Sequence, residues 1–525
     1  MQFAPSTPSA NGPAKRCALA FATLAFGIPD RRRSAVVFST GGSPGSATGG
    51  AGCGSDGSYI GMTCIAGGAG SGATGWMSRG ERDEQTSSPE FVQGMFMKRQ
   101  RRCPASINGK YPPKSSTLLG RTEIGGGMLR AVPIVCLLLF SGACLERIAT
   151  TGFPAAFDEL EHVSYAAYLQ ETGRLLPRFE EQRTLSPSDL SRWDDRPNYL
   201  GHPSPFYALM ALVLDRTLPP GQAILMPRLA SAGLLLLGVA LALGAGRRQF
   251  DRDGVGLILF CLAVALCPKL LAVSGQVSND SLAFLGGALA YWGASEEERC
   301  WRGAAAIGLG LALTFWAKPN AGLAVGAWLS IFLLLKTPLR PGLLLAAGLG
   351  LAVGCIPYVF LIMSYGAVVP IVVESFGNVR QMDGFASYLP VFLLTLGHTW
   401  ALSQTGEWPI TQAGAVLTIL LFWGVVGCAA LGGLAAWPCR RAPQAAIAVA
   451  APAAFALVLA IHLWFASTSL GFSLPAASFR YYLPLWPPLA HAVAFGVAAE
   501  RGVPWRRASL VMVSFAALAA GWLSP

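Results

Sequence analysis

Four ionisable side chains stand within five residues in FDELEHVSYAAYLQ, the segment of residues 157–170: Asp158, Glu159, Glu161 and His162. A carboxylate in such a place can take a proton from an acceptor hydroxyl or amine, or can hold a divalent cation against a phosphate leaving group. A histidine four residues after Asp158 would share a helix face with it, where it could orient the carboxylate or bind a metal ion. From residue types and spacing alone, a helix cap with solvated neighbours is an equally good interpretation of Asp158.

The composition around this segment is typical of a multi-spanning membrane protein. Hydrophobic residues make up 53% of the 525-residue chain and charged residues 13%, and the mean hydropathy is +0.48. Apolar runs long enough to cross a bilayer recur from residue 129 onward, so we expect an all-α polytopic fold with about eleven transmembrane helices. The expected spans are 130–147, 224–246, 254–273, 280–294, 302–317, 320–336, 342–363, 413–437, 444–466, 479–499 and 506–524.

Residues 1–127 differ from the rest of the chain. They are rich in Gly, Ser and Ala and carry 14 Lys and Arg against 7 Asp and Glu, so they have too little apolar surface to offset the entropy of ordering. We expect a disordered basic extension before a transmembrane domain of residues 128–525. Because MLRAVPIVCLLLF from Met128 looks like a natural start, our interpretation is a non-functional extension from a mis-called gene start. The alternative is a tail whose KRQRR touches anionic lipid or nucleic acid; we expect membrane lipid, and no nucleic acid, among the partners.

The distribution of basic residues orients the spans. The run HPSPFYALMALVLDRTLPP at 202–220 has an apolar part of about 13 residues and contains Asp215, so it is too short and too polar to span and is expected at the interface. With the N-terminus cytoplasmic, the short loops GRRQFDRDG, SEEERCWRG, KTPLRPG, PCRRAPQ and ERGVPWRR all fall on the cytoplasmic side, as the positive-inside rule requires. The other side then carries two long extracytoplasmic loops, 148–223 and 364–412.

The ionisable segment lies near the start of the first of these loops. The residues that follow it, VSYAAYLQETGRLLP, place small and apolar side chains among polar ones. This pattern predicts a short amphipathic helix that lies on the membrane surface and carries Asp158 and His162 at the outer face.

Two cations are predicted near the same surface. Lys318 lies between two apolar runs in WAKPN, and Arg480 opens the expected span 479–499 next to Tyr481 and Tyr482. An ionisable residue between spans is costly unless it faces a polar cavity, and a planar guanidinium can clamp a phosphate. Lys318, Arg480 and Tyr481 are therefore candidate phosphate ligands. The alternatives are a snorkelling Lys318 and an Arg480 that anchors at the interface with its aromatic neighbours.

The ordered set of motifs resembles the GT-C glycosyltransferases. The acidic pair with its histidine is followed by GRLLP, HPSPFYALMA, SNDSLAFLGGALAY, WAKPN and FRYYLPLWPPLA, between residues 130 and 500. The arm of the superfamily that is most similar contains the protein O-mannosyltransferases, the lipid A aminoarabinose transferase and bacterial membrane proteins whose first loop reads Pro-Asp-Glu-x-x-His. Here Ala-Phe precedes Asp158, while Asp158, Glu159 and His162 keep the spacing.

This resemblance implies an enzyme of the bacterial cytoplasmic membrane. The donor would be a polyprenyl-phosphate-linked sugar, the acceptor an extracytoplasmic glycan, lipid or protein, and the anomeric carbon would be inverted. Asp158 would serve as base or metal ligand with Glu159 beside it, which leaves open a divalent cation, Mg²⁺ or Mn²⁺. His202 in HPSP is a weaker match, and Asp280 after Asn279 is the candidate for a second acidic site.

Two other function classes use the same residues. In a lipid-linked glycan transporter or flippase, Lys318, Asp280 and the first-loop acids would line a translocation path. In a non-catalytic member, they would bind a lipid-linked glycan without transfer. Replacement of the first-loop acids in a transfer assay separates the enzyme from both.

Overall fold

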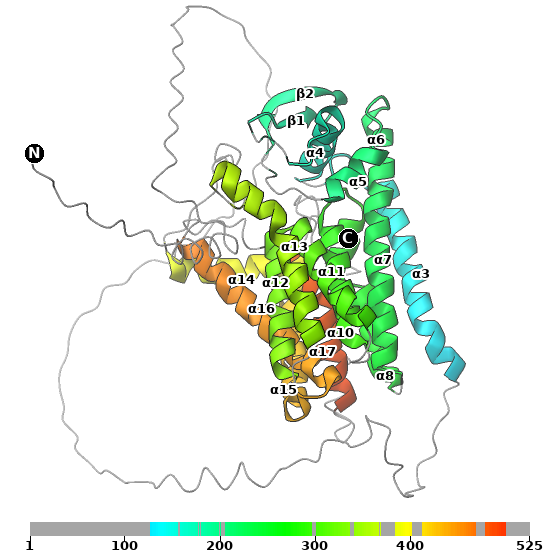
Figure 1. The fold of residues 1–525 in the computed structure, drawn as a ribbon. Helices are drawn as coiled ribbons and strands as arrows, with labels where there is room; N and C mark the ends of the chain where they lie inside the picture. The colour runs from blue at the N-terminus through cyan, green and yellow to red at the C-terminus, as the bar shows by residue number, and fades with distance from the viewer. Residues whose placement is uncertain are drawn as a thin grey trace, which may run out of the picture. The chain divides into compact units, whose positions relative to one another are not determined.

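The chain folds into α-helices with one small β-hairpin (Figure 1). The computed structural model describes residues 126–499, apart from 156–157, 177, 179, 199, 201–204, 252, 297–300, 337–340, 367, 369–383, 402–411 and 469–477. These residues belong to one compact unit. His202, the expected span 506–524 and almost all of the extension 1–127 lie outside the described residues.

Long apolar helices occupy expected spans, which confirms a helical multi-pass membrane protein. Five described helices are long and apolar enough to cross a membrane, or six if α8 and α9, bent by 40° at a short break, form one span. Apolar side chains along α3 and α13 are exposed, as a lipid-facing surface requires. The helices are α3 (Gly126–Thr150), α7 (Leu225–Gln249), α13 (Pro341–Tyr365), α15 (Gln412–Ala436) and α16 (Pro443–Thr468), with α8 (Gly254–Ala265) and α9 (Pro268–Ser274) as the bent pair.

Shorter helices occupy four of the other expected positions: α10 (Asp280–Ser295), α11 (Trp301–Ala317), α12 (Pro319–Leu335) and α17 (Trp486–Ala499). Helices α10 and α11 pack directly on each other. A Cβ added to Gly286 would lie 2.7 Å from the carbonyl oxygen of Gly310, and one on Gly310 would lie 2.5 Å from that of Gly286. Only glycine permits this approach, as at small-residue interfaces in membranes. The packing brings the start of α10 to the end of α11, where Asp280 and Lys318 stand.

The first outer loop forms a folded layer of α4 (Glu159–Thr172), β1 (Arg183–Ser186), β2 (Asp189–Pro197), α5 (Pro205–Val213) and α6 (Pro220–Ala223). The strands pair antiparallel, and α5, with nine residues, is too short to span, as expected. Helix α4 corrects the expectation of an amphipathic surface helix, because every side chain from Glu159 to Leu169 is buried. The reason is tertiary: α5 and β1 both pack on α4. Gly173, with φ of 66°, ends the helix in a left-handed conformation.

The second outer loop contains a helix that the sequence analysis did not predict, α14 (Phe385–Ala401). It packs against α9, α15 and η4 (Phe479–Leu485), the 3-10 helix that replaces the first part of the expected span 479–499. A second 3-10 turn, η2 (Trp437–Cys439), follows α15. Helices α9, α14 and η4 therefore contact one another. An ion pair from Arg480 of η4 to Asp158 connects this group to the first outer loop.

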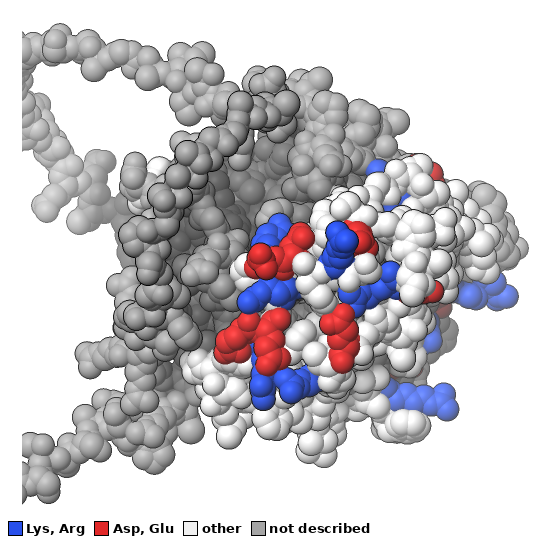
Figure 2. Space-filling view, turned by 90° about the horizontal axis from the view of Figure 1, so that it is seen from above, with Lys and Arg blue, Asp and Glu red and all other residues white. Residues whose placement is uncertain are grey.

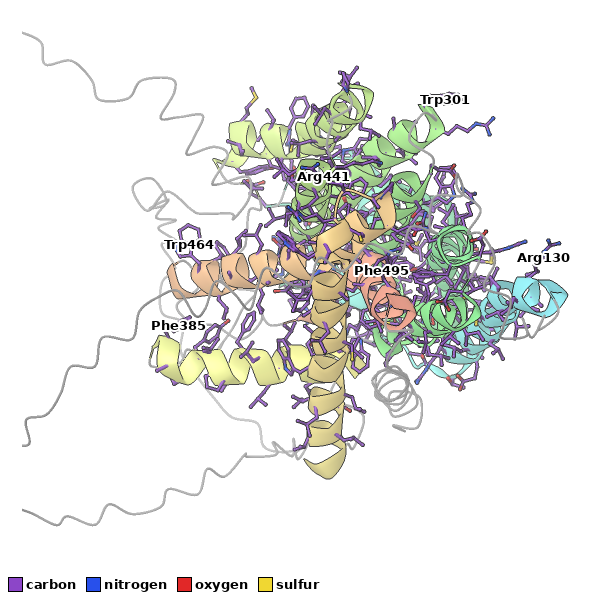
Figure 3. All side chains as sticks on the ribbon, turned by 90° about the horizontal axis from the view of Figure 1, so that it is seen from below. Arg130, Trp301, Phe385, Arg441, Trp464 and Phe495 are labelled. Carbon is purple, nitrogen blue, oxygen red and sulfur yellow. The ribbon has the colours of Figure 1, made fainter. Side chains whose placement is uncertain are left out.

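The two ends of the helices carry different side chains. Helix α3 begins, and the α7–α8 and α15–α16 connections lie, at the lower end in Figure 1, opposite α4, α5 and the hairpin. Figure 3 shows Arg130 of α3 and Arg441 of the α15–α16 turn from below. This arrangement agrees with the expected grouping of basic loops on one side. From above, acidic and basic side chains gather together on the described face (Figure 2).

A buried ion pair joins the outer layer to the spans. Arg228 of α7 donates from Nε to Glu159 Oε1 and from Nη2 to Oε2, both at 2.8 Å. The Glu159 oxygens also accept from the backbone N–H groups of Ala155 (2.6 Å) and Val277 (2.9 Å). Arg228 further donates to the carbonyl oxygens of Thr151 and Gly152. The pair therefore fixes the end of α3, the start of α4 and the turn before α10 to one another.

We expect Arg228→Met to be strongly destabilising. The change leaves the Glu159 carboxylate buried without its guanidinium, which costs about 3–5 kcal/mol for ion pairs of this kind. The measurement is the thermal unfolding midpoint of the purified chain in detergent. Arg178→Met is the matched control, because the Arg178 and Glu181 side chains are 61% and 44% exposed and water and salt screen an ion pair at the surface. Equal midpoints for the two variants would show that the buried pair does not hold the outer layer.

Candidate functional site

Asp158 forms an ion pair with Arg480, 322 residues away in the sequence. Asp158 directly precedes α4, and Arg480 lies in η4. Asp158 is the N-cap residue of α4, but its side chain makes no capping hydrogen bond, so the cap interpretation is not supported. The Asp158 and Arg480 side chains are 11% and 16% exposed. Arg480 also contacts Tyr481, whose ring centroid is 5.3 Å from the guanidinium carbon.

Asp280 and Lys318 form a second, deeper ion pair. Lys318 Nζ lies 2.6 Å from Asp280 Oδ1, and the two side chains are 7% and 3% exposed. The hydroxyl of Ser278 donates to Asp280 Oδ2 over 3.0 Å. Lys318 is the single residue between α11 and α12, with extended backbone, so the break between these helices turns its side chain toward the start of α10. Snorkelling does not describe a lysine that is buried and paired.

A third cation joins these residues. Lys269 of α9 is buried and interacts electrostatically with Arg480, Asp280, Lys318 and Asp158. We call Asp158, Lys269, Asp280, Lys318 and Arg480 the charge cluster. Its three cations face two carboxylates, so at neutral pH the described residues of the cluster carry one excess positive charge. In a surrounding of low polarity such an excess favours the binding of an anion.

His162 lies beside the charge cluster without joining its ion pairs. Its ring is buried, and Nδ1 is 2.9 Å from the Tyr207 hydroxyl of α5. Burial lowers the pKa of His162 to about 3, with the charges of Asp158, Lys318, Asp280 and Arg480 as smaller and partly opposed influences. The imidazole is therefore neutral at physiological pH. It orients toward Tyr207 rather than hydrogen-bonding to Asp158.

The remaining acid of the opening segment, Glu161, lies on another side of α4. Its Oε1 accepts from Arg196 of β2 at 2.8 Å, while the Glu161 side chain is 2% exposed and that of Arg196 is 52% exposed. Burial raises the pKa of Glu161 to about 7, a backbone hydrogen bond and the charge of Arg196 lower it, and the charge of Asp158 raises it. Glu161 therefore belongs to the contact between α4 and the hairpin.

The structure brings most of the predicted site residues together. Asp158, Asp280, Lys318 and Arg480 form two adjacent ion pairs, and Asn279 donates to Tyr207 and to the carbonyl oxygen of Ala317 at the same place. Glu159 stands apart in its pair with Arg228.

Sequence reasoning missed three residues of this region: Lys269 in the charge cluster, Tyr207 beside His162, and Arg228 in the structural pair with Glu159. Two of them had a signal, because Arg228 and Lys269 are ionisable residues inside expected spans. Tyr207 had none, since a tyrosine in an apolar interfacial run is ordinary.

The proposed metal pair does not form in this arrangement. Both Glu159 oxygens accept hydrogen bonds from Arg228 and from backbone N–H groups, and the Asp158 carboxylate meets the cation Arg480. Within the described part of the chain, no group of three or more His, Cys, Asp or Glu side chains could hold a metal ion. Asp158 and Glu159 thus meet guanidinium groups and not each other, so the predicted metal-binding pair is not assembled among the described residues.

Comparison with known proteins gives structural matches of low identity. No protein-family model and no curated protein matches the sequence. ArnT from Cupriavidus metallidurans in the apo state is similar at 15% identity and a TM-score of 0.44, over 73% of this chain and 62% of that one. The Archaeoglobus fulgidus oligosaccharyltransferase tethered with an acceptor peptide is similar at 13% identity and a TM-score of 0.46, over 76% and 55%. The chain thus spans less than two thirds of the length of each of these proteins.

Glu161 makes stability depend on pH in a direction that can be tested. Because its pKa in the folded chain is about 7, above the ordinary value of 4.5, the folded protein holds this proton more tightly than the unfolded chain does. The protonated Glu161 side chain therefore contributes fully to the free energy of unfolding below pH 4.5, and this contribution falls as the pH rises toward 7. Glu161→Gln should therefore unfold at a temperature that falls less than that of the wild type between pH 5 and pH 8.

The control is Asp195→Asn, which changes an exposed carboxylate of the same hairpin. We expect this variant to follow the wild-type curve. A Glu161→Gln curve parallel to that of the wild type would contradict the assignment of a proton to Glu161.

Proposed function

We propose that this chain is a GT-C-type membrane glycosyltransferase that moves a sugar from a polyprenyl-phosphate donor to an extracytoplasmic acceptor. The observation that carries the proposal is the charge cluster. Its three cations outnumber its two carboxylates, and one of those carboxylates, Asp158, is partly exposed. The resemblance of the motif order to the GT-C glycosyltransferases gives the reaction class. The charge cluster supports the proposal because it offers cations for the donor phosphate and a carboxylate for the acceptor proton.

The donor phosphate fits the cations of the charge cluster. A sugar linked to a polyprenyl phosphate is a phosphodiester with one negative charge, which would balance the one excess positive charge. Arg480 is the outermost of the three cations and can donate two parallel hydrogen bonds to phosphate oxygens. Lys318 and Lys269 supply positive charge deeper in the site. The lipid chain can reach this place from the bilayer because the site lies at the outer end of membrane-spanning helices.

Asp158 would act as the general base. As the acceptor hydroxyl oxygen forms its bond to the anomeric carbon, the proton of the hydroxyl passes to the Asp158 carboxylate, and the bond between the anomeric carbon and the phosphate oxygen breaks. The electron pair of that bond stays on the polyprenyl phosphate, where Arg480 and Lys318 stabilise the developing charge. Attack opposite to the leaving phosphate inverts the anomeric carbon.

The ion pair between Asp158 and Arg480 suggests how the donor prepares the base. A phosphate that takes the Arg480 guanidinium would compete with the Asp158 carboxylate for the same N–H groups. Binding of the donor would then release a carboxylate oxygen of Asp158 to accept the proton of the acceptor. Asp280 keeps Lys318 in place, and Glu159 acts as a positioning residue through Arg228.

We expect Asp158→Asn to lower transfer by about 100-fold to 10,000-fold, the range that general-base catalysis contributes. The assay uses the full-length protein in nanodiscs, a panel of polyprenyl-phosphate sugars, glycan, lipid and protein acceptors, and mass spectrometric detection of the glycosylated acceptor and of released polyprenyl phosphate. Asp194→Asn is the matched control, since Asp194 is an exposed carboxylate in the same loop, and it should keep wild-type activity.

Three outcomes separate the candidate functions. A folded Asp158→Asn variant with full activity would sink the role of Asp158 as base. Movement of the donor across the bilayer without any transfer product, in the wild type, would favour a transporter. Donor binding without transfer or movement would favour a non-catalytic glycan-binding protein.

A further inference from the structure

The neutral imidazole of His162 has one ring nitrogen engaged and one without a protein partner. Nδ1 lies 2.9 Å from the hydroxyl oxygen of Tyr207, and the two rings stack with centroids 5.7 Å apart. Nε2 is buried and has no hydrogen-bond partner among the described residues. A buried polar atom in this state needs a partner from outside the described chain, such as a ligand or an ordered water molecule.

The hydrogen-bond chain behind His162 determines which nitrogen carries the proton. The carbonyl oxygen of Ala317 can only accept, so the Asn279 atom 2.9 Å from it must be the amide nitrogen. The same amide nitrogen lies 3.4 Å from the Tyr207 oxygen and donates its second hydrogen there. Tyr207 accepts from Asn279, and of its two hydrogen-bond partners only Nδ1 of His162 can accept, so we assign the Tyr207 O–H to that nitrogen. Nδ1 is then the acceptor, and the single proton of the neutral ring sits on Nε2.

A second contact holds Tyr207 in this role. Its ring stacks on that of Tyr165 with centroids 4.0 Å apart and an interplanar angle of 16°. Tyr165, Tyr207 and His162 are all fully or almost fully buried. The Tyr207 hydroxyl therefore has a fixed position between helix α4 and the start of α10.

We infer that Tyr207 is a positioning residue that fixes His162 as a neutral Nε2–H donor, and that this N–H binds an oxygen of the phosphate of the lipid-linked donor. This inference rests on the proposed function for the identity of the ligand. A phosphate held by Arg480 and Lys318 is the anion at hand, since both cations are among the charges that act on His162. His162 cannot take a proton through Nδ1 while Tyr207 donates to it, so His162 is a binding group and the base is Asp158.

The tautomer can be measured without any assay of transfer. The full-length protein labelled with ¹⁵N-histidine is studied in nanodiscs by NMR, and the His162 signals are assigned by their loss in His162→Gln. We expect the Nε2-protonated neutral tautomer at pH 7. Tyr207→Phe should lose this single tautomer and give a mixture. The control Tyr168→Phe, which changes a tyrosine on α4 whose hydroxyl donates to Glu181, should keep it. An Nδ1-protonated or cationic ring in the wild type would overturn the inference.

Addition of undecaprenyl phosphate tests the ligand. We expect the His162 Nε2 resonance to shift on binding, while Nδ1 keeps the shift of an acceptor. A lipid that binds, as measured by its retention on the nanodiscs, without a change at Nε2 would refute the contact and leave the proposed function standing. A lipid that does not bind at all would refute the proposed function and the contact, and the tautomer result would still stand.

The activities of His162→Gln and His162→Asn in the transfer assay test the same Nε2–H group. A Gln side chain places its amide N–H₂ near the position of Nε2, whereas an Asn side chain reaches only that of Nδ1. We expect His162→Gln to keep at least ten times the kcat/KM of His162→Asn, and Tyr207→Phe to raise KM for the donor more than it lowers kcat. Equal activity of the Gln and Asn variants would contradict a donor role for Nε2.

Discussion

Burial of charge in an apolar helical structure is the constraint on which the site depends. Three buried carboxylates at the start of α4 and α10 each meet a cation from a distant segment: Asp158 meets Arg480, Glu159 meets Arg228, and Asp280 meets Lys318. An unpaired charge there would cost several kcal/mol, roughly as much as the net stability of a small domain. These pairs therefore fix the order in which the loop, the broken helices and η4 come together. The fold of the outer end is set by charge pairing as much as by apolar packing.

The buried pairs divide into two kinds. Glu159 and Arg228 satisfy each other and four backbone groups, so their contact is complete and its effect is structural. In the charge cluster, Lys269 adds a third cation to two carboxylates, and the side chains of Arg480 and Asp158 remain partly exposed. Access to solvent therefore distinguishes the charge cluster from the fully buried pair of Glu159 and Arg228. The neutral His162 lies beside the charge cluster. Its Nδ1 has a hydrogen-bond partner in Tyr207, and its Nε2 has none among the described residues.

The sequence predicted the parts of this arrangement that leave a local signature. Apolar length placed α3, α7, α13, α15 and α16, and the described connections α7–α8 and α15–α16, which carry basic residues, lie at one end of the helices. Asp158, Lys318 and Arg480 were found because each is a charge next to an apolar run, and Asp280 was a candidate through the resemblance to the GT-C glycosyltransferases. The sequence could not show that Asp158 pairs with Arg480 or that Glu159 pairs with Arg228, because these partners are 322 and 69 residues apart and no local pattern joins them. The burial of α4 was also missed, because the elements that pack on it, α5 and β1, come from other segments of the chain.

The central claim is that the excess positive charge of the charge cluster holds the phosphate of a polyprenyl lipid. The most direct measurement is the binding of undecaprenyl phosphate, compared with uncharged undecaprenol, to the wild type and to Lys269→Met in nanodiscs. A charge-assisted hydrogen bond contributes about 1.5–3 kcal/mol, so Lys269→Met should weaken binding of the phosphate by roughly 10-fold to 100-fold and leave the weak binding of undecaprenol unchanged. Equal affinity of the wild type for the phosphate and the alcohol, or an unchanged affinity of Lys269→Met for the phosphate, would contradict the account.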